Sequence, residues 1–399
     1  MPNQIFYKYI LPSVACSFAA NDTKVAGIYL HIPFCKQACT YCNFHFSTSL
    51  QMKDDMIAAI LRELEVRRDY LPEQPIETIY FGGGTPSVLS ADEIKQITEQ
   101  IYKLYKVENL KEFTLEANPD DLTAQYLKEL RDTAISRFSI GVQSFRDEDL
   151  QYMNRAHNAQ QADRAIKTAQ DAGFGNLTID LIYGTPGLTD ADWKYNLGMI
   201  KTLGIPHFSS YALTVEEGTL LHHNIKRNKT TPVDPAQAAG QFEILMAAAA
   251  DMGYDHYEIS NLALPGHHAV HNTNYWMGVP YIGIGPSAHS YNLQSRSWNI
   301  ANNALYIKSM LTENTIPLET ETLTTEQQLN EYLMTSLRTM WGCDMSKIAA
   351  TWGTDYSKQI LHGAERFAER GQLLLKDNKL ILTDAGKLFA DSIAGELFV

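Results

Sequence analysis

The 399-residue chain contains few cysteines, no long apolar run and no excess of positive charge. Because its five cysteines are few and odd in number, we expect no disulfide framework and a reducing, cytoplasmic location. No apolar run reaches the length of a membrane span. The formal net charge of −13 argues against nucleic acid as a partner, since phosphate binding needs a basic face. These absences favour a globular protein, which at this length holds about two or three domains.

Residues 1–26 are expected to form an N-terminal extension ahead of the first strand. The run Val14–Ala20 has the small-residue ending of a secretory signal, which is the alternative. Pro12 and Ser13 interrupt the apolar stretch that such a signal needs, so the extension is favoured.

Three of the five cysteines lie within eight residues, at Cys35, Cys39 and Cys42. Three thiolates can hold three irons of a cubane cluster and leave the fourth iron open, whereas clusters that only carry electrons usually take four cysteines. The C-x3-C-x2-C spacing is the one that S-adenosylmethionine (SAM) radical proteins use. With His45, the same cysteines could instead form a structural Cys3His zinc site. Chance clustering of core cysteines is the remaining alternative, and the triplet alone leaves all three open.

Short β-rich runs alternate with amphipathic helical stretches from Gly27 to about Ala212. This alternation implies parallel strands joined by right-handed crossovers. Six such units predict an α/β fold, a partial (β/α)6 TIM-like barrel over residues 27–215, with its chemistry at the C-terminal strand ends. The expected strands are 27–34, 78–81, 112–116, 137–142, 177–183 and 207–213, and the expected helices are 52–70, 91–105, 122–131, 147–172 and 191–203.

The pattern changes after the barrel, where a C-terminal α+β region is expected. Residues 216–320 are interpreted as a connecting region, and residues 321–399 as a winged-helix-like domain. The expected elements are an alanine-rich helix at 235–252, an irregular stretch at 258–291, a helix at 326–340, two short helices, and paired strands at 372–375 and 379–382.

Polar residues follow several of the expected strands. Gly83, Gly84 and Thr85 belong to a glycine-rich turn whose backbone can approach a ligand closely. Asp180 could hold a ribose diol and Arg155 a carboxylate. Each residue alone could equally be a turn or capping residue, but parallel strand ends meet at one mouth, where these segments are expected to converge. The polar residues at or just past the strand ends are Glu116, Gln143, Arg155 and Asp180.

The stretch from His256 to His289 is rich in histidine and aromatic residues and contains the sequence His271-Asn-Thr-Asn-Tyr275-Trp276. Imidazole can ligate haem iron, and Tyr275 and Trp276 can pack on a flat macrocycle. Histidines in loops mostly form local hydrogen bonds, so this stretch does not name a ligand by itself.

Several motifs occur together in one order along the chain. They are Tyr29–Cys42, the GGGTP turn at 82–86, Glu116, Gly141–Phe145, Arg155, Ile179–Gly184 and Gly283–His289. Together they resemble the coproporphyrinogen-oxidase-like branch of the radical-SAM superfamily, from about Gly27 to the C-terminus. The resemblance favours the iron–sulfur cluster over zinc.

Two kinds of protein compete within this branch. Oxygen-independent coproporphyrinogen III oxidases, which use radical chemistry to decarboxylate porphyrinogen propionates, typically have a longer N-terminal segment and a fourth cysteine two residues after the third. This chain has Phe44 at that position. Phe44 and the motif at 271–276 resemble HemW-type haem chaperones instead, so a haem carrier is favoured. The oxidase and a radical-SAM enzyme with another substrate are the alternatives.

The resemblance implies a ligand for each of these residues. Cys35, Cys39 and Cys42 would ligate a 4Fe–4S cluster whose fourth iron takes SAM. The positions that match the family's SAM site are Tyr29, Gly83, Gly84, Thr85, Glu116, Gln143, Arg155, Asp180 and Ala212, with Tyr41 packing near the adenine. Haem, assigned to His271, Tyr275 and Trp276, would be delivered to haem-accepting proteins. The family also implies a homodimer and contact with membrane-bound acceptors.

Overall fold

The computed structural model of the protein describes residues 25–72 and 74–399. The expected extension, and with it the alternative of a secretory signal, therefore lies outside the described residues except for Val25 and Ala26. The described chain forms two compact units, Val25–Thr322 and Leu323–Val399. The segments expected at 27–215 and 216–320 both lie within the first of these, which we call the barrel unit; the second is the C-terminal unit.

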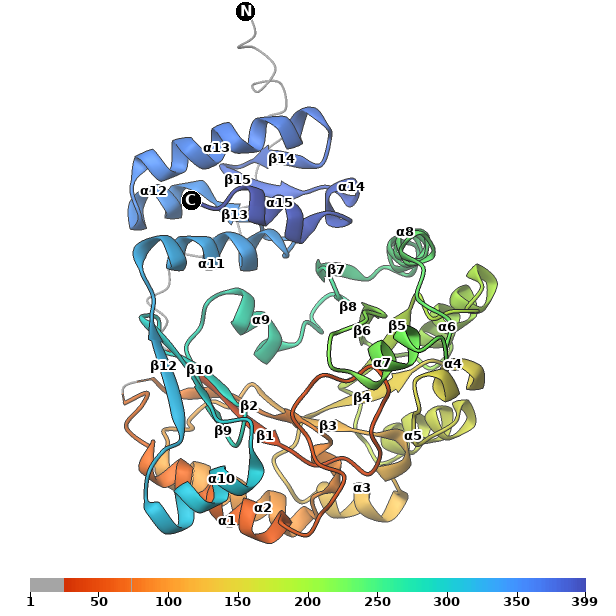
Figure 1. Cartoon of the computed structure of the whole chain (residues 1–399), viewed down its shortest axis with the longest axis vertical. Helices are drawn as coiled ribbons and strands as arrows, with labels where there is room; N and C mark the ends of the chain where they lie inside the picture. Colours follow the sequence, from red (N-terminus) through yellow and green to blue (C-terminus); the bar gives the residue numbers. More distant parts are fainter. Residues whose placement is uncertain (1–24, 73) are drawn as a thin grey trace, which may run out of the picture. The chain divides into compact units, whose positions relative to one another are not determined.

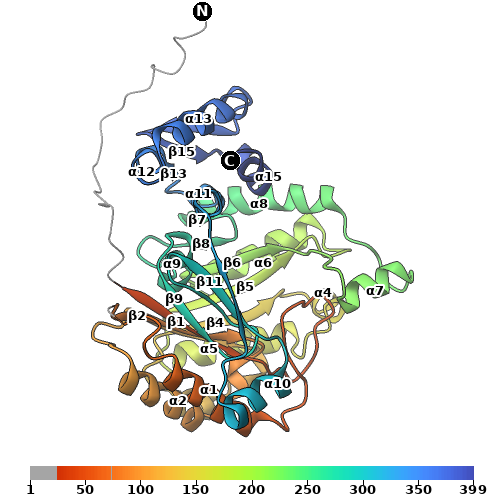
Figure 2. The same ribbon diagram turned by 60° about the vertical axis from the view of Figure 1, so that its left-hand side comes forward.

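A curved sheet forms the centre of the barrel unit, as Figure 1 and Figure 2 show. Its first six strands are parallel and lie side by side in sequence order, with helices between them along the chain. This arrangement confirms the predicted partial (β/α)6 barrel. The strands are β1 (Ala26–Ile32), β2 (Ile76–Gly83), β3 (Glu112–Ala117), β4 (Arg137–Gln143), β5 (Leu177–Tyr183) and β6 (His207–Ala212).

Side chains alternate between the two faces of these strands. On β1, Ile28 and Leu30 are fully buried on one face. Tyr29 points to the opposite face, where its ring stacks on that of Tyr80 from β2 at 6.0 Å. We call this the inner face; it also carries Glu116 from β3. Both faces of a parallel sheet are usually apolar, so a polar and aromatic inner face indicates a site.

The barrel helices follow the prediction with one exception. The expected helix at 147–172 is two helices, because Asn154 adopts a left-handed backbone (φ 55°) and Asn158 caps a new helix by accepting a hydrogen bond from the Gln161 N–H at 2.9 Å. The helices are α1 (Lys53–Val66), α2 (Ala91–Leu104), α3 (Ala124–Leu130), α4 (Asp147–Tyr152), α5 (Ala159–Asp171) and α6 (Asp190–Thr202), with short 3-10 turns η1 (Pro86–Val88) and η2 (Pro119–Asp121).

The stretch expected to be irregular, 258–291, contains regular secondary structure, namely short strands and one helix, so that prediction is wrong. It contains strands of only three or four residues, which are too short to show a period. One of them, β9, pairs in parallel with β1 and extends the sheet beyond the barrel. The remaining elements of the unit are α7 (Leu220–Lys226), α8 (Pro235–Met252), β7 (Asp255–Glu258), β8 (Asn261–Ala263), α9 (Val270–Trp276), β9 (Tyr281–Ile284), β10 (His289–Tyr291), β11 (Ser295–Asn299), α10 (Asn303–Lys308), the π-helical turn η3 (Ser309–Glu313) and β12 (Leu318–Thr322).

The C-terminal unit is winged-helix-like, as predicted, with helices followed by a small antiparallel sheet. Asp377 and Asn378 both have positive φ in the two-residue turn of its hairpin, which is typical of a type I′ turn. None of the helices in residues 25–72 and 74–399 combines the length and apolar character needed to cross a bilayer. The elements are α11 (Thr325–Leu337), β13 (Cys343–Asp344), α12 (Met345–Thr351), α13 (Thr354–Glu369), β14 (Leu373–Lys376), β15 (Lys379–Leu382), α14 (Asp384–Lys387) and α15 (Ala390–Glu396).

Candidate functional site

The three clustered cysteines lie in the loop that leaves the C-terminal end of β1. The Cys35 N–H donates to the Ser47 carbonyl at 3.0 Å, which closes the base of the loop. Further along, the Thr40 N–H donates to the Met153 carbonyl at 3.0 Å and holds the loop against the end of α4. The loop is therefore fixed at both places, at the end of the sheet where the predicted site lies.

Two of the thiols receive hydrogen bonds from residues of the predicted site. The Thr85 hydroxyl donates to Cys35 Sγ at 3.3 Å, and Arg155 Nη1 lies 3.2 Å from Cys39 Sγ. Burial raises the pKa of the Cys35 thiol to about 11 and also raises the pKa of Cys42. Because metal ligation needs thiolates, cluster binding here would release protons, and the two donors would stabilise the sulfur charge.

His45, the fourth ligand of the zinc alternative, is engaged elsewhere. Its Nε2 shares a hydrogen bond of 2.7 Å with Asn303 Oδ1, and its carbonyl oxygen pairs with His31 Nε2 at 2.8 Å. Among the described residues, no group of three or more His, Cys, Asp or Glu side chains is placed to hold a metal ion, with or without His45. The donor set that the loop offers is three thiols, as an open-iron cluster requires.

The glycine-rich turn after β2 packs directly on the end of β1. The Gly84 N–H donates to the Ile32 carbonyl at 2.9 Å, and the Thr85 N–H to the Phe34 carbonyl at 2.7 Å. Gly83 has φ 105°, and a Cβ there would lie 2.5 Å from His31 Nδ1. Only glycine fits this position, so the turn brings its backbone beside the cysteine loop.

Glu116 is the acidic group of the inner face next to this turn. Tyr80 donates its hydroxyl proton to Glu116 Oε1 at 2.7 Å, and the Gly83 N–H also donates to the carboxylate. Burial raises the pKa of Glu116 to about 7 in spite of these donors. A buried carboxyl with a raised pKa gains from a cationic partner, so Glu116 can receive an amino group.

Arg155 lies just past the break between α4 and α5 and reaches back over the strand ends. Its Nη2 donates to Asn118 Oδ1 at 2.6 Å and to the Gly141 carbonyl at 2.7 Å. Its Nε is buried and has no hydrogen-bond partner among the described residues. A buried, unpaired donor on a guanidinium is suited to an anion such as a carboxylate. Gln143 lies beside it at the end of β4, with the positive φ of 67°.

The remaining predicted SAM-site residues surround the same opening. Asp180 lies midway along β5 and not at the strand end where it was expected, and burial raises its pKa to about 6. Tyr41, from the cysteine loop, lies near Arg155 and packs on an apolar cluster that includes Met153. Ala212 ends β6. The structure therefore brings the cysteine loop, the glycine turn and the charged residues to one mouth, and the assignment of each to SAM stays a prediction.

His271 lies away from this mouth. It is 1% exposed on α9, beside the N-terminal half of β2, where its Nδ1 shares a hydrogen bond of 2.8 Å with Thr78 Oγ1. Its Nε2 pairs with the Tyr275 hydroxyl at 2.8 Å. Burial lowers its pKa to about 3. Both ring nitrogens are thus occupied, and in this conformation His271 offers no open nitrogen to an iron.

The other two residues of the predicted haem motif are partly buried on the same helix. The Tyr275 ring meets the Tyr281 ring of β9 edge-on at 4.6 Å, and Trp276 ends α9. Tyr275 therefore joins α9 to the strand that extends the sheet past β1. Whether these rings contact haem stays a prediction.

Sequence analysis missed the residues that hold α9 in place. Glu112 accepts hydrogen bonds from the Val270 and His271 N–H groups at 2.7 and 3.2 Å, and Arg137 lies beside it at 4.0 Å. Tyr80 was missed too, although its place two residues before Gly82 puts it on the same face as the glycine turn. Period-two alternation within each strand was the available signal.

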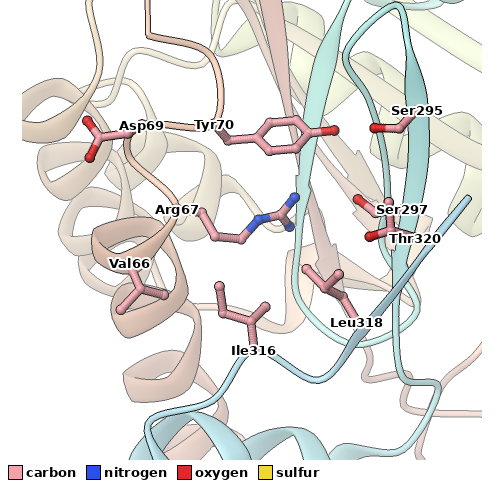
Figure 3. A pocket seen from close by; sticks show the side chains of 9 residues that line it. All are labelled: Val66, Arg67, Asp69, Tyr70, Ser295, Ser297, Ile316, Leu318 and Thr320. Carbon is pink, nitrogen blue, oxygen red and sulfur yellow. The ribbon is translucent and has the colours of Figure 1, made fainter. Parts of the chain in front are cut away.

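A cavity of about 270 Å³ lies elsewhere in the barrel unit, between the end of α1 and the β11–β12 pair (Figure 3). Arg67, in its wall, is already bound to Glu63 at 2.9 Å and covers the Tyr70 ring. None of the predicted site residues lines it. The lining residues are Val66, Arg67, Asp69, Tyr70, Ser295, Ser297, Ile316, Leu318 and Thr320. We therefore place the candidate site at the barrel mouth and inner face.

Comparison with known proteins gives matches over most of the chain. Residues 29–199 match the Radical SAM superfamily. The heme chaperone HemW of Bacillus subtilis is 32% identical over 370 residues, which cover 92% of this chain and 97% of that protein. The heme chaperone HemW of Lactococcus lactis is 35% identical over 366 residues, covering 91% and 94%. Coproporphyrinogen III oxidase (HemN) of Escherichia coli matches in structure with a TM-score of 0.81 at 21% identity, over 94% of this chain and 90% of that chain.

These matches differ in what they show. At 21% identity the likeness to HemN shows a shared fold. The HemW matches exceed 30% identity and span almost the full length of both proteins. The chain therefore belongs to the HemW family within the radical SAM superfamily.

Proposed function

We propose that the protein is a haem chaperone that binds haem and transfers it to acceptor proteins, and that it carries a 4Fe–4S cluster with an open iron for SAM. Membership of the radical SAM superfamily implies the cluster and SAM. The observation that carries the proposal is the match, at 32% and 35% identity over nearly the full length of the chain, to proteins named heme chaperone HemW. Phe44, which is 68% exposed where the oxidases have a fourth cysteine, supports the carrier over the oxidase.

Cys35, Cys39 and Cys42 would hold the cluster. Their common loop and the donors from Thr85 and Arg155 to two of the sulfurs support this assignment. When bound, the cluster and SAM supply one-electron chemistry at the sulfonium. The residues of the chain hold the sulfur ligands in place and surround the opening with buried side chains.

The strand ends would bind the amino-acid and nucleoside parts of SAM. Glu116 would take the amino group and Arg155 the carboxylate, and the unpaired Nε of Arg155 supports the second role. Asp180 would hold the ribose hydroxyls and Tyr41 would pack near the adenine. The other residues of this proposed site are Tyr29, Gly83, Gly84, Thr85, Gln143 and Ala212.

Haem would be held at the motif of α9. Because both ring nitrogens of His271 are hydrogen-bonded, binding of the iron by this residue requires α9 to open. Tyr275 and Trp276 would then contact the macrocycle. The same proposal includes delivery of haem to acceptor proteins, some of them membrane-bound. It also includes a homodimer and a cytoplasmic location.

An anaerobic haem titration of the cluster-reconstituted protein, followed by Soret absorbance, tests the proposal. We expect saturation near one haem per chain, weaker binding by His271→Ala, and unchanged binding by His362→Ala. His362 is an exposed histidine of α13 and serves as the matched control. Absence of saturable binding, together with conversion of coproporphyrinogen to protoporphyrinogen, would overturn the proposal in favour of the oxidase.

A further inference from the structure

Four side chains connect the mouth of the barrel to α9 across the inner face. Glu116 accepts the Tyr80 hydroxyl proton at 2.7 Å. The Tyr80 ring stacks on the His271 ring, with centroids 4.9 Å apart and planes 26° apart. His271 Nε2 pairs with the Tyr275 hydroxyl at 2.8 Å. We call Glu116, Tyr80, His271 and Tyr275 the inner-face relay.

The strand register shows that Tyr80 is the link in this relay. Thr78, Tyr80 and Gly82 follow one another on the inner face of β2, at steps of about 7 Å. Thr78 bonds to His271, and a Cβ on Gly82 would lie 3.1 Å from Glu116 Cδ. His271 and Glu116 therefore lie at different depths, and the tyrosine between them contacts both.

We propose that Tyr80 is a positioning residue that couples the mouth to α9, so that SAM at Glu116 and haem at His271 oppose each other's binding. The inference rests on the proposed function, since it takes SAM and haem as the two ligands. It goes beyond that function because it names the residue through which one ligand acts on the other.

The coupling follows from the charge on Glu116. Burial raises the pKa of this carboxyl to about 7, and an ammonium group bound to it keeps it ionised. A hydroxyl bonds more strongly to an ionised carboxylate than to a neutral acid, so the ligand holds Tyr80 in place. The Tyr80 ring then keeps His271 packed against Thr78 and Tyr275. Haem needs the opposite state, in which the 1% exposed imidazole is released.

Hydrogen exchange of the α9 amides tests the relay without haem. In the cluster-reconstituted protein, we expect SAM to slow exchange in Val270–Trp276 of the wild type. Tyr80→Phe keeps the ring on His271 but removes the bond to Glu116, and we expect SAM to have no effect on α9 in this variant. Tyr105→Phe is the matched control, because it removes one buried hydroxyl bond, to the Leu64 carbonyl at 3.1 Å, away from the inner face.

Haem titrations with and without SAM test whether SAM and haem oppose each other's binding. We expect SAM to weaken haem binding about fivefold or more in the wild type and in Tyr105→Phe, and this factor to fall to about one in Tyr80→Phe. Equal SAM effects in Tyr80→Phe and wild type, or no SAM effect on either readout in the wild type, would overturn the inference while saturable haem binding leaves the proposed function standing. If haem does not saturate the wild type but SAM still slows exchange at α9 through Tyr80, the proposed function and the opposition to haem fail, whereas the coupling of the mouth to α9 stands.

Discussion

The interior of the barrel unit and the core of the C-terminal unit are built from different kinds of side chain. Within Leu323–Val399 the buried polar residues are Ser336, Thr339 and Ser357, and none is ionisable. The barrel unit buries many ionisable groups, namely His31, Glu63, Arg67, Glu77, Glu112, Asp121, Arg137, Asp149, His157, His207, Glu258 and His271. Buried charges are costly unless they are paired. The difference indicates that paired buried charges help to hold the barrel interior together, whereas the C-terminal core relies on apolar packing.

The largest effect should come from Glu63→Ala in the barrel unit. Glu63 is fully buried and accepts hydrogen bonds from Arg67, the Gly285 N–H, Asn299 and Tyr306, at 2.6 to 2.9 Å. Removing the carboxylate leaves Arg67 buried without its partner, so we expect a loss of about 3–5 kcal/mol in the free energy of unfolding. Urea denaturation, monitored by hydrogen exchange, measures this loss separately in each unit.

Tyr306→Phe is the control for this change, because it removes one of the four donors and keeps the charge pair. We expect it to cost about 1.5–3 kcal/mol, as a hydrogen bond to a charged group does. A loss below about 1 kcal/mol for Glu63→Ala would contradict the view that the barrel depends on buried charge.

The next largest effect should come from acid, which we expect to destabilise the barrel unit more than the C-terminal unit. Burial lowers the pKa of His31 and His157 to about 4 and that of His271 to about 3. Below pH 6.5 these histidines are therefore protonated in the unfolded chain but stay neutral in the folded barrel. The free energy of unfolding falls as the pH drops from 6.5 toward 4. At pH 5 each of the three histidines costs about 2 kcal/mol.

Two carboxyls act in the opposite direction. The pKa of Glu116 is raised to about 7 and that of Asp180 to about 6, so the folded barrel takes up protons there and regains about 3 kcal/mol by pH 5. For these five groups the expected net loss between pH 7 and pH 5 is about 2–3 kcal/mol, and His207, whose pKa is also lowered by burial, adds to it. Hydrogen exchange at both pH values, corrected for intrinsic rates, should show barrel amides opening first. Earlier opening of the C-terminal unit would break the comparison.

Arg155→Gln should weaken SAM binding, and we expect this change in free energy to be smaller than the losses of stability above. The change removes a charged donor that contacts Cys39, Asn118 and the Gly141 carbonyl. We expect SAM to bind about 10–100-fold more weakly to the cluster-reconstituted variant, as the loss of a charged hydrogen bond implies. Calorimetric titration measures this, with Arg146→Gln as control, since Arg146 pairs with Asp149 and Glu148 and contacts none of the described cysteines. Equal affinities for the two variants would count against the assignment of Arg155.

The smallest effect is expected in the C-terminal unit, from Asp344→Ala. The Asp344 side chain caps α12 by accepting from the Ser346 and Lys347 N–H groups at 2.8 and 3.1 Å. Loss of such a cap costs about 1 kcal/mol, and Asp344→Asn should restore most of it. Thermal denaturation resolved by hydrogen exchange should show the loss in residues 323–399 alone. A matching loss in the barrel amides would show that the two units do not respond separately.

The six barrel strands could be predicted from sequence because each is a run of alternating or continuous apolar residues ending in a polar turn. The expected strand at 137–142 and the observed β4 (Arg137–Gln143) differ by one residue, for example. The cysteine loop and the glycine turn could be predicted as neighbours because parallel strand ends meet. The structure confirms that neighbourhood through the bond from Thr85 to Cys35.

The position of the haem motif could not be predicted in the same way. His271 lies 193 positions after Thr78 in the chain, and no local pattern reports their hydrogen bond. The same holds for Glu112, whose contact with the start of α9 joins residues 158 apart. The break between Tyr152 and Ala159 was missed because the connection contains no glycine or proline; its left-handed residue is Asn154.

The parallel pairing of β9 with β1 has a consequence for synthesis of the chain. β1 gains its second neighbour only when Tyr281–Ile284 has been made. That is roughly 250 residues later, or about 13–50 s at usual translation rates. Until then the strand that leads into Cys35 has an open hydrogen-bonding edge, which invites pairing with the wrong chain. Iron–sulfur insertion after release from the ribosome therefore acts on a strand enclosed on both sides, whereas earlier insertion acts on an edge.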